Sequence, residues 1–256
     1  HLQAAEQGLT LEYKSPMLDQ LQDWAKKQAE SSGFKTVGVY AGALGWGYNT
    51  EIFKSKGYKE PVCWADLLAP ELKGEIQIAN PNSSGTAYTA LASLVQIMGE
   101  DQAIDYLKKL NTNISQYTKS GSAPVKAAAR GETGLGIVFM HDVVAQTAEG
   151  FPVKSIAPCE GTGYEIGSMS LIKGAKNMAN AKKWYDWALS VEGQAVGAAA
   201  KVSYQVPSNK AAPVPAAAPK LADIKLINYD FAKYGSSAER TRLLKRWDSE
   251  VGNQPK

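Results

Sequence analysis

The fold is decided by residues 76–99, which read IQIANPNSSGTAYTALASLVQIMG. The run at 76–79 is short and apolar, as in a buried strand, and a polar turn follows it. From Thr86 onward, apolar residues recur at helical spacing until Gly99, a residue that commonly ends a helix. The segment therefore predicts a strand, a polar turn and a helix.

The same alternation recurs along the chain. Further strands are expected at 36–48, 134–140, 153–157 and 166–172. Helices are expected at 1–7, from Ser15-Pro16 to about 24, and at 102–110, 123–130, 143–149, 179–200 and 238–251. Strands that alternate with helices predict an α/β fold with open, largely parallel sheets. We find no internal repeat.

Composition excludes several classes of protein. The 256 residues carry 28 basic and 25 acidic side chains, spread without a basic block, so a nucleic-acid partner is not expected. No apolar run approaches the roughly 18 residues of a membrane span, and the first residues lack the profile of a signal peptide. His1 and His141 are the two histidines, which excludes multi-histidine metal sites. The two cysteines leave either one disulfide or two buried thiols.

The turn Ser83-Ser84-Gly85-Thr86 is a candidate anion site. Hydroxyls and free backbone N–H groups at a helix N-terminus bind anions without a cationic side chain. The alternative is a plain helix cap. No lysine follows the glycine, so the turn is not the phosphate loop of a nucleotide hydrolase.

Two further places carry polar residues of interest. His141 and Asp142 follow a buried strand, at the sheet edge where open α/β sheets bind ligands, and the alternative is a capping aspartate beside a buried histidine. Glu165 begins a later strand and could equally be a solvated edge charge. The glycines at 161–167 resemble a dinucleotide-binding pattern, but a strand rather than a helix follows them. A connection that bends between two lobes explains these glycines better. The GxSxG motif of serine hydrolases is absent.

The order of these segments resembles the periplasmic solute-binding proteins of ABC importers in the ferric-binding superfamily. The resemblance rests on residues 45–50, 64–74, 80–89, 127–131 and 206–209. It implies a type II-like periplasmic binding protein fold of two α/β lobes, with the ligand held between them. The N-terminal lobe would comprise 1–46 and 162–210, without its first strand–helix units, and the C-terminal lobe would comprise 47–161 and 211–256.

The resemblance is closer to the hexose-phosphate branch than to the iron-binding branch. Iron-binding relatives carry a neighbouring tyrosine pair where this chain has residues 139–142, which read FMHD. In the hexose-phosphate branch a His-Asp pair and a later Glu hold sugar hydroxyls, and these map onto His141, Asp142 and Glu165. The chemistry agrees, because a carboxylate accepts hydrogen bonds from two vicinal hydroxyls. The phosphate would meet Ser83, Ser84, Gly85 and Thr86.

The resemblance therefore implies a monomeric periplasmic protein that binds a phosphorylated sugar and delivers it to a membrane permease. No catalysis, cofactor or metal is expected, and oxidising export predicts that Cys63 and Cys159 form a disulfide within one lobe. The alternatives are a ferric-ion, phosphonate or inorganic-anion binding protein of the same superfamily. A phosphatase-type enzyme using His141 or Asp142 is the alternative of another class, and it lacks a positioned nucleophile or metal cluster.

Overall fold

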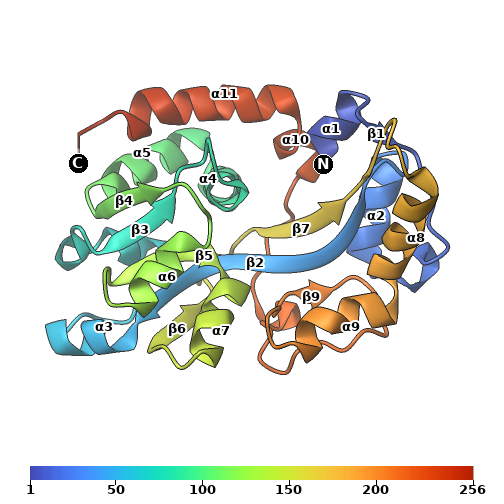
Figure 1. Cartoon of the computed structure of the whole chain (residues 1–256). Helices are drawn as coiled ribbons and strands as arrows, with labels where there is room; N and C mark the ends of the chain where they lie inside the picture. Colours follow the sequence, from blue (N-terminus) through green and yellow to red (C-terminus); the bar gives the residue numbers. More distant parts are fainter. Residues whose placement is uncertain (256) are drawn as a thin grey trace. The chain divides into compact units, whose positions relative to one another are not determined.

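The computed structural model describes residues 1–255, which form two compact units (Figure 1). Unit 1 contains His1–Gly42, Ile166–Ala218 and Gly235–Ser237, and unit 2 contains Ala43–Glu165, Pro219–Tyr234 and the chain from Ala238 onward. The lobe boundaries expected from the sequence, at 46/47, 161/162 and 210/211, stay a prediction. The chain passes between the units within strands β2 (Val37–Asn49) and β7 (Tyr164–Met169).

The sheet of unit 2 has the strand order β4-β3-β5-β2-β6. Its remaining strands are β3 (Ile76–Ala79), β4 (Ile114–Thr118), β5 (Leu135–Phe139) and β6 (Val153–Ile156). Strand β3 runs parallel to both β4 and β5, whereas β2 is antiparallel to β5 and β6. The α/β class is therefore confirmed, but the sheet is mixed rather than largely parallel, because β2 enters it from unit 1 in the opposite direction.

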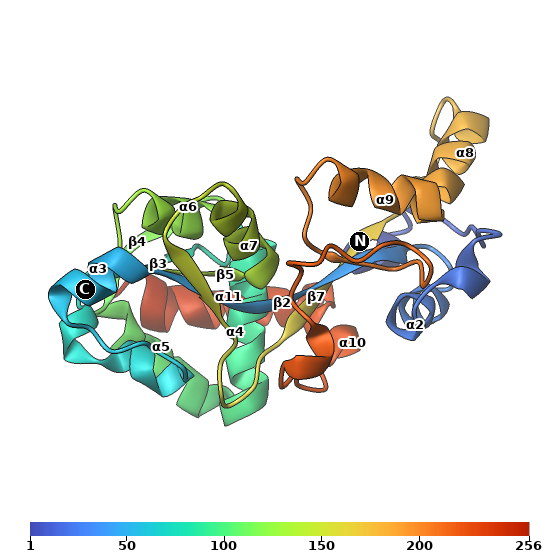
Figure 2. The ribbon, with the colours of Figure 1, turned by 90° about the horizontal axis from the view of Figure 1, so that it is seen from below.

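Helices cover both faces of this sheet (Figures 1 and 2). On one face lie α4 (Gly85–Met98), α5 (Glu100–Asn111) and α11 (Ser237–Trp247), and on the other lie α6 (Ala123–Ala129) and α7 (Met140–Ala148). Short helices complete the unit: α3 (Thr50–Lys56), α10 (Phe231–Tyr234), 3-10 turns at Trp64–Leu68, Pro70–Leu72 and Leu221–Asp223, and a π turn at Asp248–Gly252.

Each face has its own apolar core. The larger core, under α4 and α5, includes the fully buried Trp46, Trp64 and Leu94. The smaller core, under α6 and α7, contains Val125, Ala128, Val138, Val143 and Val153. Alternate residues of β2 point to opposite faces, so Trp46 enters the larger core while Gly45 and Gly47 face the smaller one.

The glycines of β2 allow close packing on the α7 side. A Cβ atom on Gly47 would lie 2.8 Å from Val143 Cγ1 and 2.9 Å from Val125 Cγ2. A Cβ atom on Gly45 would overlap the Ile156 carbonyl oxygen. These positions therefore let α6 and α7 pack closely on the sheet and let β6 pair beside β2, as close backbone approach at a strand glycine allows.

Unit 1 contains shorter strands and several helices. Strand β1 (Thr10–Leu11) pairs antiparallel with β8 (Leu171–Ile172), and β9 (Val206–Pro207) pairs with β2 at Tyr40 and Ala41. The helices are α1 (Leu2–Glu6), α2 (Asp23–Ser31), α8 (Met178–Leu189) and α9 (Val191–Ala199), with a 3-10 turn at Leu18–Gln20. Leu21, Ala25, Val37 and Leu189 form the centre of its core.

Three element boundaries differ from the sequence expectation. The helix expected from Ser15 begins only at Asp23, because Leu21 is extended after a single 3-10 turn. The helix expected at 179–200 is two helices, because Ser190 is extended and caps the second. Helix α7 begins at Met140, so His141 and Asp142 lie inside the helix rather than before it.

The disulfide prediction is confirmed. Cys63 and Cys159 are joined by an S–S bond of 2.09 Å within unit 2, and no free cysteine remains in the described chain. Among residues 1–255, no helix is both long and apolar enough to cross a membrane.

Candidate functional site

The first predicted site residues lie where β3 leads into α4. Ser84 is the N-cap of α4, and its buried hydroxyl accepts a hydrogen bond from the Ala87 N–H at 3.4 Å. The N–H groups of Ser83 and Ser84 donate to the Asn80 carbonyl at 3.1 and 3.0 Å. The N–H groups of Gly85 and Thr86 have no protein acceptor within residues 1–255. The turn is therefore a cap that also presents open donors at the positive end of a 14-residue helix.

A second loop, after β4, packs directly on this turn. Gly121 lies so close that a Cβ atom on it would overlap Thr86 Oγ1 and stand 3.0 Å from Ser84 Oγ. The Ser83 hydroxyl donates to the Lys119 carbonyl at 3.1 Å. This loop was not among the site residues predicted from the sequence. Its one signal is a glycine between two serines, residues 120–122, just before a helix.

His141 and Asp142 lie in the first turn of α7. His141 is buried and Asp142 is half-buried, with His141 Nε2 3.9 Å from Asp142 Oδ1. The Phe139 ring stacks on the imidazole, with ring centres 5.6 Å apart. The N-cap of α7 is Phe139, so the alternative reading of Asp142 as the cap of this helix is wrong.

Burial sets the charges of this pair. Burial lowers the pKa of His141 to about 4, so the imidazole is neutral at pH 7 and offers one donor and one acceptor. Burial also raises the pKa of Asp142 to about 6, a rise that the positive charge of Lys126 on α6 opposes. At pH 7 the pair therefore combines a neutral imidazole with a carboxylate that accepts hydrogen bonds.

The parallel strands bring these two groups to one edge of the sheet. Strands β3, β4 and β5 run in the same direction as direct neighbours, so the α4 turn, the loop at 119–122 and the start of α7 follow their carboxyl ends. Ligands of open α/β sheets bind at such an edge. Glu165, half-buried on β7, belongs to a different strand, and its place with the others remains a prediction.

One group of side chains in the described chain has the geometry to hold a metal ion: Cys63, Cys159 and Glu160. Both sulfurs are committed to the disulfide. The Glu160 carboxylate accepts from the Trp64 and Ala65 N–H groups at 2.7 and 3.0 Å. The sulfur and oxygen atoms that could bind a metal are therefore already engaged, the sulfurs in the disulfide and the carboxylate in hydrogen bonds to the backbone.

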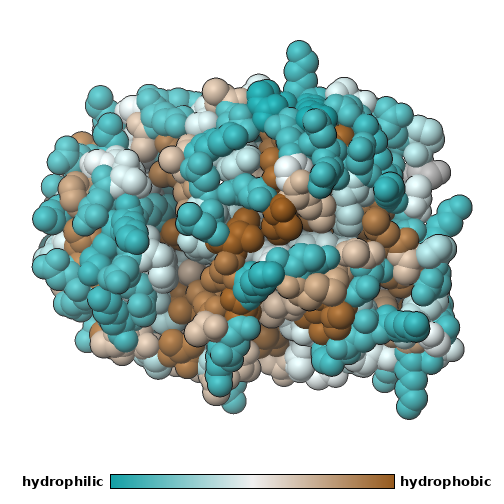
Figure 3. Space-filling model, turned by 180° about the vertical axis from the view of Figure 1, so that it is seen from behind, coloured by the Kyte–Doolittle hydropathy of each residue, from teal (hydrophilic) through white to brown (hydrophobic). Residues whose placement is uncertain are grey.

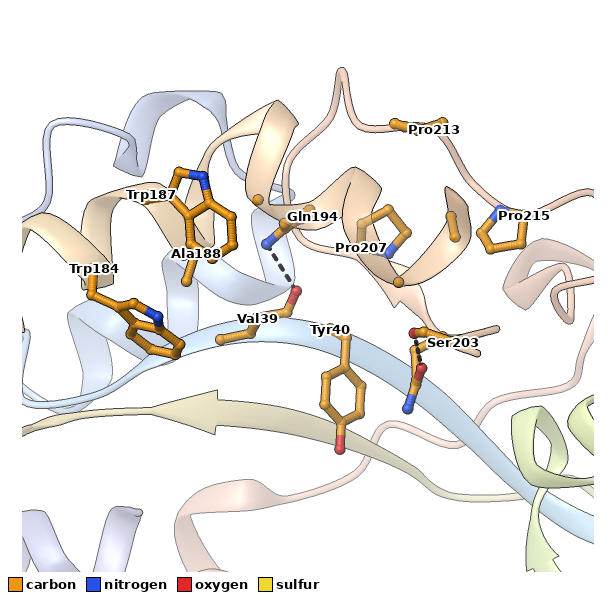
Figure 4. A pocket seen from close by; sticks show the side chains of 14 residues that line it. Val39, Tyr40, Trp184, Trp187, Ala188, Gln194, Ser203, Pro207, Pro213 and Pro215 are labelled. Carbon is orange, nitrogen blue, oxygen red and sulfur yellow. Dashed lines mark hydrogen bonds between the residues drawn. The ribbon is translucent and has the colours of Figure 1, made fainter. Parts of the chain in front are cut away.

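Unit 1 has an apolar pocket of about 250 Å³ (Figure 4). Trp184, Trp187 and Pro207 are among the residues that line it, and the Gln194 amide crosses it to donate to the Val39 carbonyl at 3.1 Å. The two indoles are 61% and 46% exposed. On the face seen from behind, Figure 3 shows hydrophobic patches among hydrophilic residues. None of the predicted site residues lines this pocket.

Comparison with known proteins identifies the family. Residues 1–234 match the model of the bacterial extracellular solute-binding proteins. The structure superposes with a TM-score of 0.95 on the periplasmic binding protein AfuA of Actinobacillus pleuropneumoniae with exogenous fructose 6-phosphate bound. That protein is 48% identical, over 99% of this chain and 80% of its own.

Two further relatives support the same assignment. The periplasmic binding protein P5PA superposes with a TM-score of 0.93 at 40% identity, over 98% of this chain and 80% of its own. An uncharacterized protein of Haemophilus influenzae is 48% identical over 97% of this chain and 72% of its own length. These matches confirm the predicted periplasmic binding protein fold. The chain therefore belongs to the bacterial extracellular solute-binding proteins and is a periplasmic binding protein of an ABC importer.

Proposed function

We propose that this protein binds a phosphorylated hexose, such as fructose 6-phosphate or glucose 6-phosphate, and releases it unchanged to a membrane permease. The observation that carries the proposal is the pairing of two chemistries at one sheet edge. Open N–H donors of α4 stand at the end of β3, and the carboxylate of Asp142 stands beyond the neighbouring strand β5. The structure of a relative 48% identical to this chain has exogenous fructose 6-phosphate bound.

The phosphate end of the ligand would meet the α4 turn. The N–H groups of Gly85 and Thr86 and the hydroxyls of Ser84 and Thr86 supply hydrogen-bond donors, and the helix end supplies partial positive charge. The Ser83 hydroxyl would join them by turning away from the Lys119 carbonyl. Gly85 adds no side chain in front of these donors. A dianionic phosphate therefore has its donors without a cationic side chain.

The sugar end would be held by His141, Asp142 and Glu165. Vicinal hydroxyls can donate to the two oxygens of one carboxylate, and the neutral imidazole accepts from or donates to a third hydroxyl. Carboxylates beside the phosphate would repel it, so their place on another segment fits the opposite end of the ligand. This division predicts selectivity for a sugar phosphate over either half alone.

Calorimetric titration of Asp142→Ala and Glu165→Ala with a hexose phosphate and with inorganic phosphate tests the proposal. Each variant should lose about 2–5 kcal/mol of affinity for the sugar phosphate, because a ligand hydroxyl is left buried without a partner. Affinity for inorganic phosphate should change far less. Equal losses for both ligands, or tight Fe³⁺ binding that depends on His141 and Asp142, would contradict the proposal. Turnover of the sugar phosphate would indicate an enzyme.

A further inference from the structure

The C-terminal helix α11 lies against the turn that opens α4. Leu243, Leu244 and Trp247 form its buried face, and Arg240 precedes them at helical spacing on the same side. The family model ends at residue 234, so α11 lies outside the part of the chain that the family model matches.

Arg240 and Asp248 hold the turn from its outer side. Arg240 Nη2 donates to the carbonyls of Pro81 and Asn82 at 3.4 and 3.5 Å, and its guanidinium lies 5.2 Å from the centre of the Tyr88 ring. The Asn82 side-chain amide donates to Asp248 Oδ1 at 2.7 Å. Arg240 therefore fixes two consecutive peptides of the turn, and Asp248 fixes the side chain of the residue between them.

Because each peptide group is planar, the contacts of Arg240 with the two carbonyls also orient the two N–H groups on the inner side of the turn. A carbonyl directed at Arg240 directs the N–H of the same peptide the opposite way. The N–H groups of Asn82 and Ser83 accordingly donate to the Asn80 side chain and carbonyl, at 2.9 and 3.1 Å. Loss of the outer contacts would therefore loosen the inner bonds that place Ser83 and Ser84.

Trp247 packs beneath the same turn. Its ring lies edge-on to Tyr117, with centres 5.3 Å apart, and with Pro81 and Ala87 it borders a cavity of only about 20 Å³. A cavity of that size leaves the turn little room to shift toward the core. The turn is thus supported from below by Trp247 and from outside by Arg240 and Asp248.

A different group of residues anchors α11 itself. Arg242 and Arg246 bind Glu100 at the start of α5, at 2.6 and 2.7 Å, and Arg246 also binds Asp101 and Glu250. The pairs with Glu100 and Asp101 face α5, and the pair with Glu250 lies within the C-terminal segment, so none of these partners belongs to the turn. Arg246 is therefore a control residue on the same helix, with charge and contacts but without a link to the turn.

We propose that Arg240 and Asp248 are positioning residues that set the α4 turn for the ligand phosphate. The inference rests on the proposed function for its ligand, but its structural part is independent of any ligand. It assigns to the C-terminal helix a role in affinity beyond its role in folding.

The test compares Arg240→Met, Asp248→Ala, the conservative Arg240→Lys and the control Arg246→Met. Amide hydrogen exchange of Asn82, Ser83 and Ser84 is measured by NMR without ligand, and fructose 6-phosphate binding by calorimetry. We expect exchange about tenfold faster and affinity about tenfold weaker in Arg240→Met and Asp248→Ala, since each loses hydrogen bonds to a charged group. Arg240→Lys should recover most of both, and Arg246→Met should lower the melting temperature with both readouts nearly unchanged.

The outcomes separate the two proposals. Unchanged exchange in Arg240→Met and Asp248→Ala, or equal changes in Arg246→Met, would overturn the positioning role. Failure of the parent protein to bind any sugar phosphate would overturn the proposed function, and exchange would still decide whether α11 holds the turn.

Discussion

At the scale of single residues, Gly85 separates the capping and ligand-binding roles of the α4 turn. A Cβ atom at Gly85 would meet nothing within 4 Å, and the backbone there is not in the left-handed region. Gly85→Ala should therefore fold normally, with stability unchanged or about 0.5 kcal/mol higher. Its affinity for sugar phosphate and for inorganic phosphate should fall about tenfold, because the methyl group blocks close approach to the open N–H groups. Calorimetry checks the predicted affinities, and thermal unfolding checks the predicted stability. Unchanged affinity would mean that the turn only caps α4 and does not bind the ligand.

The pair His141 and Asp142 gives a prediction about pH. The folded pKa of Asp142, about 6, lies above its ordinary value of 3.8, so this group makes the free energy of unfolding fall as pH rises between those values. The folded pKa of His141, about 4, lies below its ordinary value of 6.5, so this group makes the free energy of unfolding rise between pH 4 and 6.5. In the parent protein the two effects oppose each other over the shared window.

Asp142→Asn removes one of the two effects. The variant should exceed the parent in free energy of unfolding by about 3 kcal/mol above pH 7, because burial of the carboxylate charge is relieved. The excess should shrink as pH falls from about 6 to 4, measured by urea denaturation at each pH. Asp223→Asn, at an exposed carboxylate, is the matched control and should show no such trend. An excess that does not vary with pH would mean that Asp142 does not titrate as described.

At the scale of elements, the glycines of β2 determine how closely α7 packs on the sheet and how β6 lies beside β2. Gly45→Ala would place a methyl group on the Ile156 carbonyl and 3.0 Å from Met140 Cγ, next to His141. We expect a loss of about 1–3 kcal/mol in the free energy of unfolding and weaker sugar-phosphate binding, because the start of α7 must shift. For stability, Gly85→Ala, which has open space around the added methyl group, is the control for the substitution itself. Parent-like stability of Gly45→Ala would contradict the close packing described for β2.

The elements also show what local sequence could and could not predict. Strand β3 and the start of α4 were predictable, because an apolar run, a polar turn and a capping serine all indicate the same boundary. Ser15 carries a similar signal, yet its hydroxyl accepts from Met17 N–H and closes only a short turn before Leu21 bridges to Asn209. Ser190 caps α9 through the Gly193 N–H, a signal hidden inside a long apolar pattern.

At the scale of the whole molecule, the disulfide links two segments of unit 2 that are 96 residues apart. Closing a loop of that length in the unfolded chain stabilises the native state by about 4.7 kcal/mol in the chain-entropy model. Reduction, or Cys63→Ser with Cys159→Ser, should therefore lower the melting temperature clearly. Titration of the unfolded, unreduced protein should find no free thiol, and two free thiols would defeat the assignment.

The site residues that could be predicted from the sequence are those that come soon after a strand. Ser84 follows β3 after a short polar turn and His141 lies two residues after β5, so chain order alone placed them at a sheet edge. Gly121 against Thr86 and Arg240 against the Pro81 carbonyl join residues far apart in sequence, and no local pattern reports such contacts. Glu165 was proposed from family resemblance, and only a binding measurement can test its role.

The central claim, that the ligand is a sugar phosphate held at both ends, is tested most directly by one calorimetric comparison. The parent protein is titrated with fructose 6-phosphate, fructose and inorganic phosphate in the same buffer, and the sugar phosphate is recovered afterwards. We predict that fructose 6-phosphate binds far more tightly than either half and is recovered intact. Inorganic phosphate binding as tightly as fructose 6-phosphate, or recovery of fructose and free phosphate, would contradict the account.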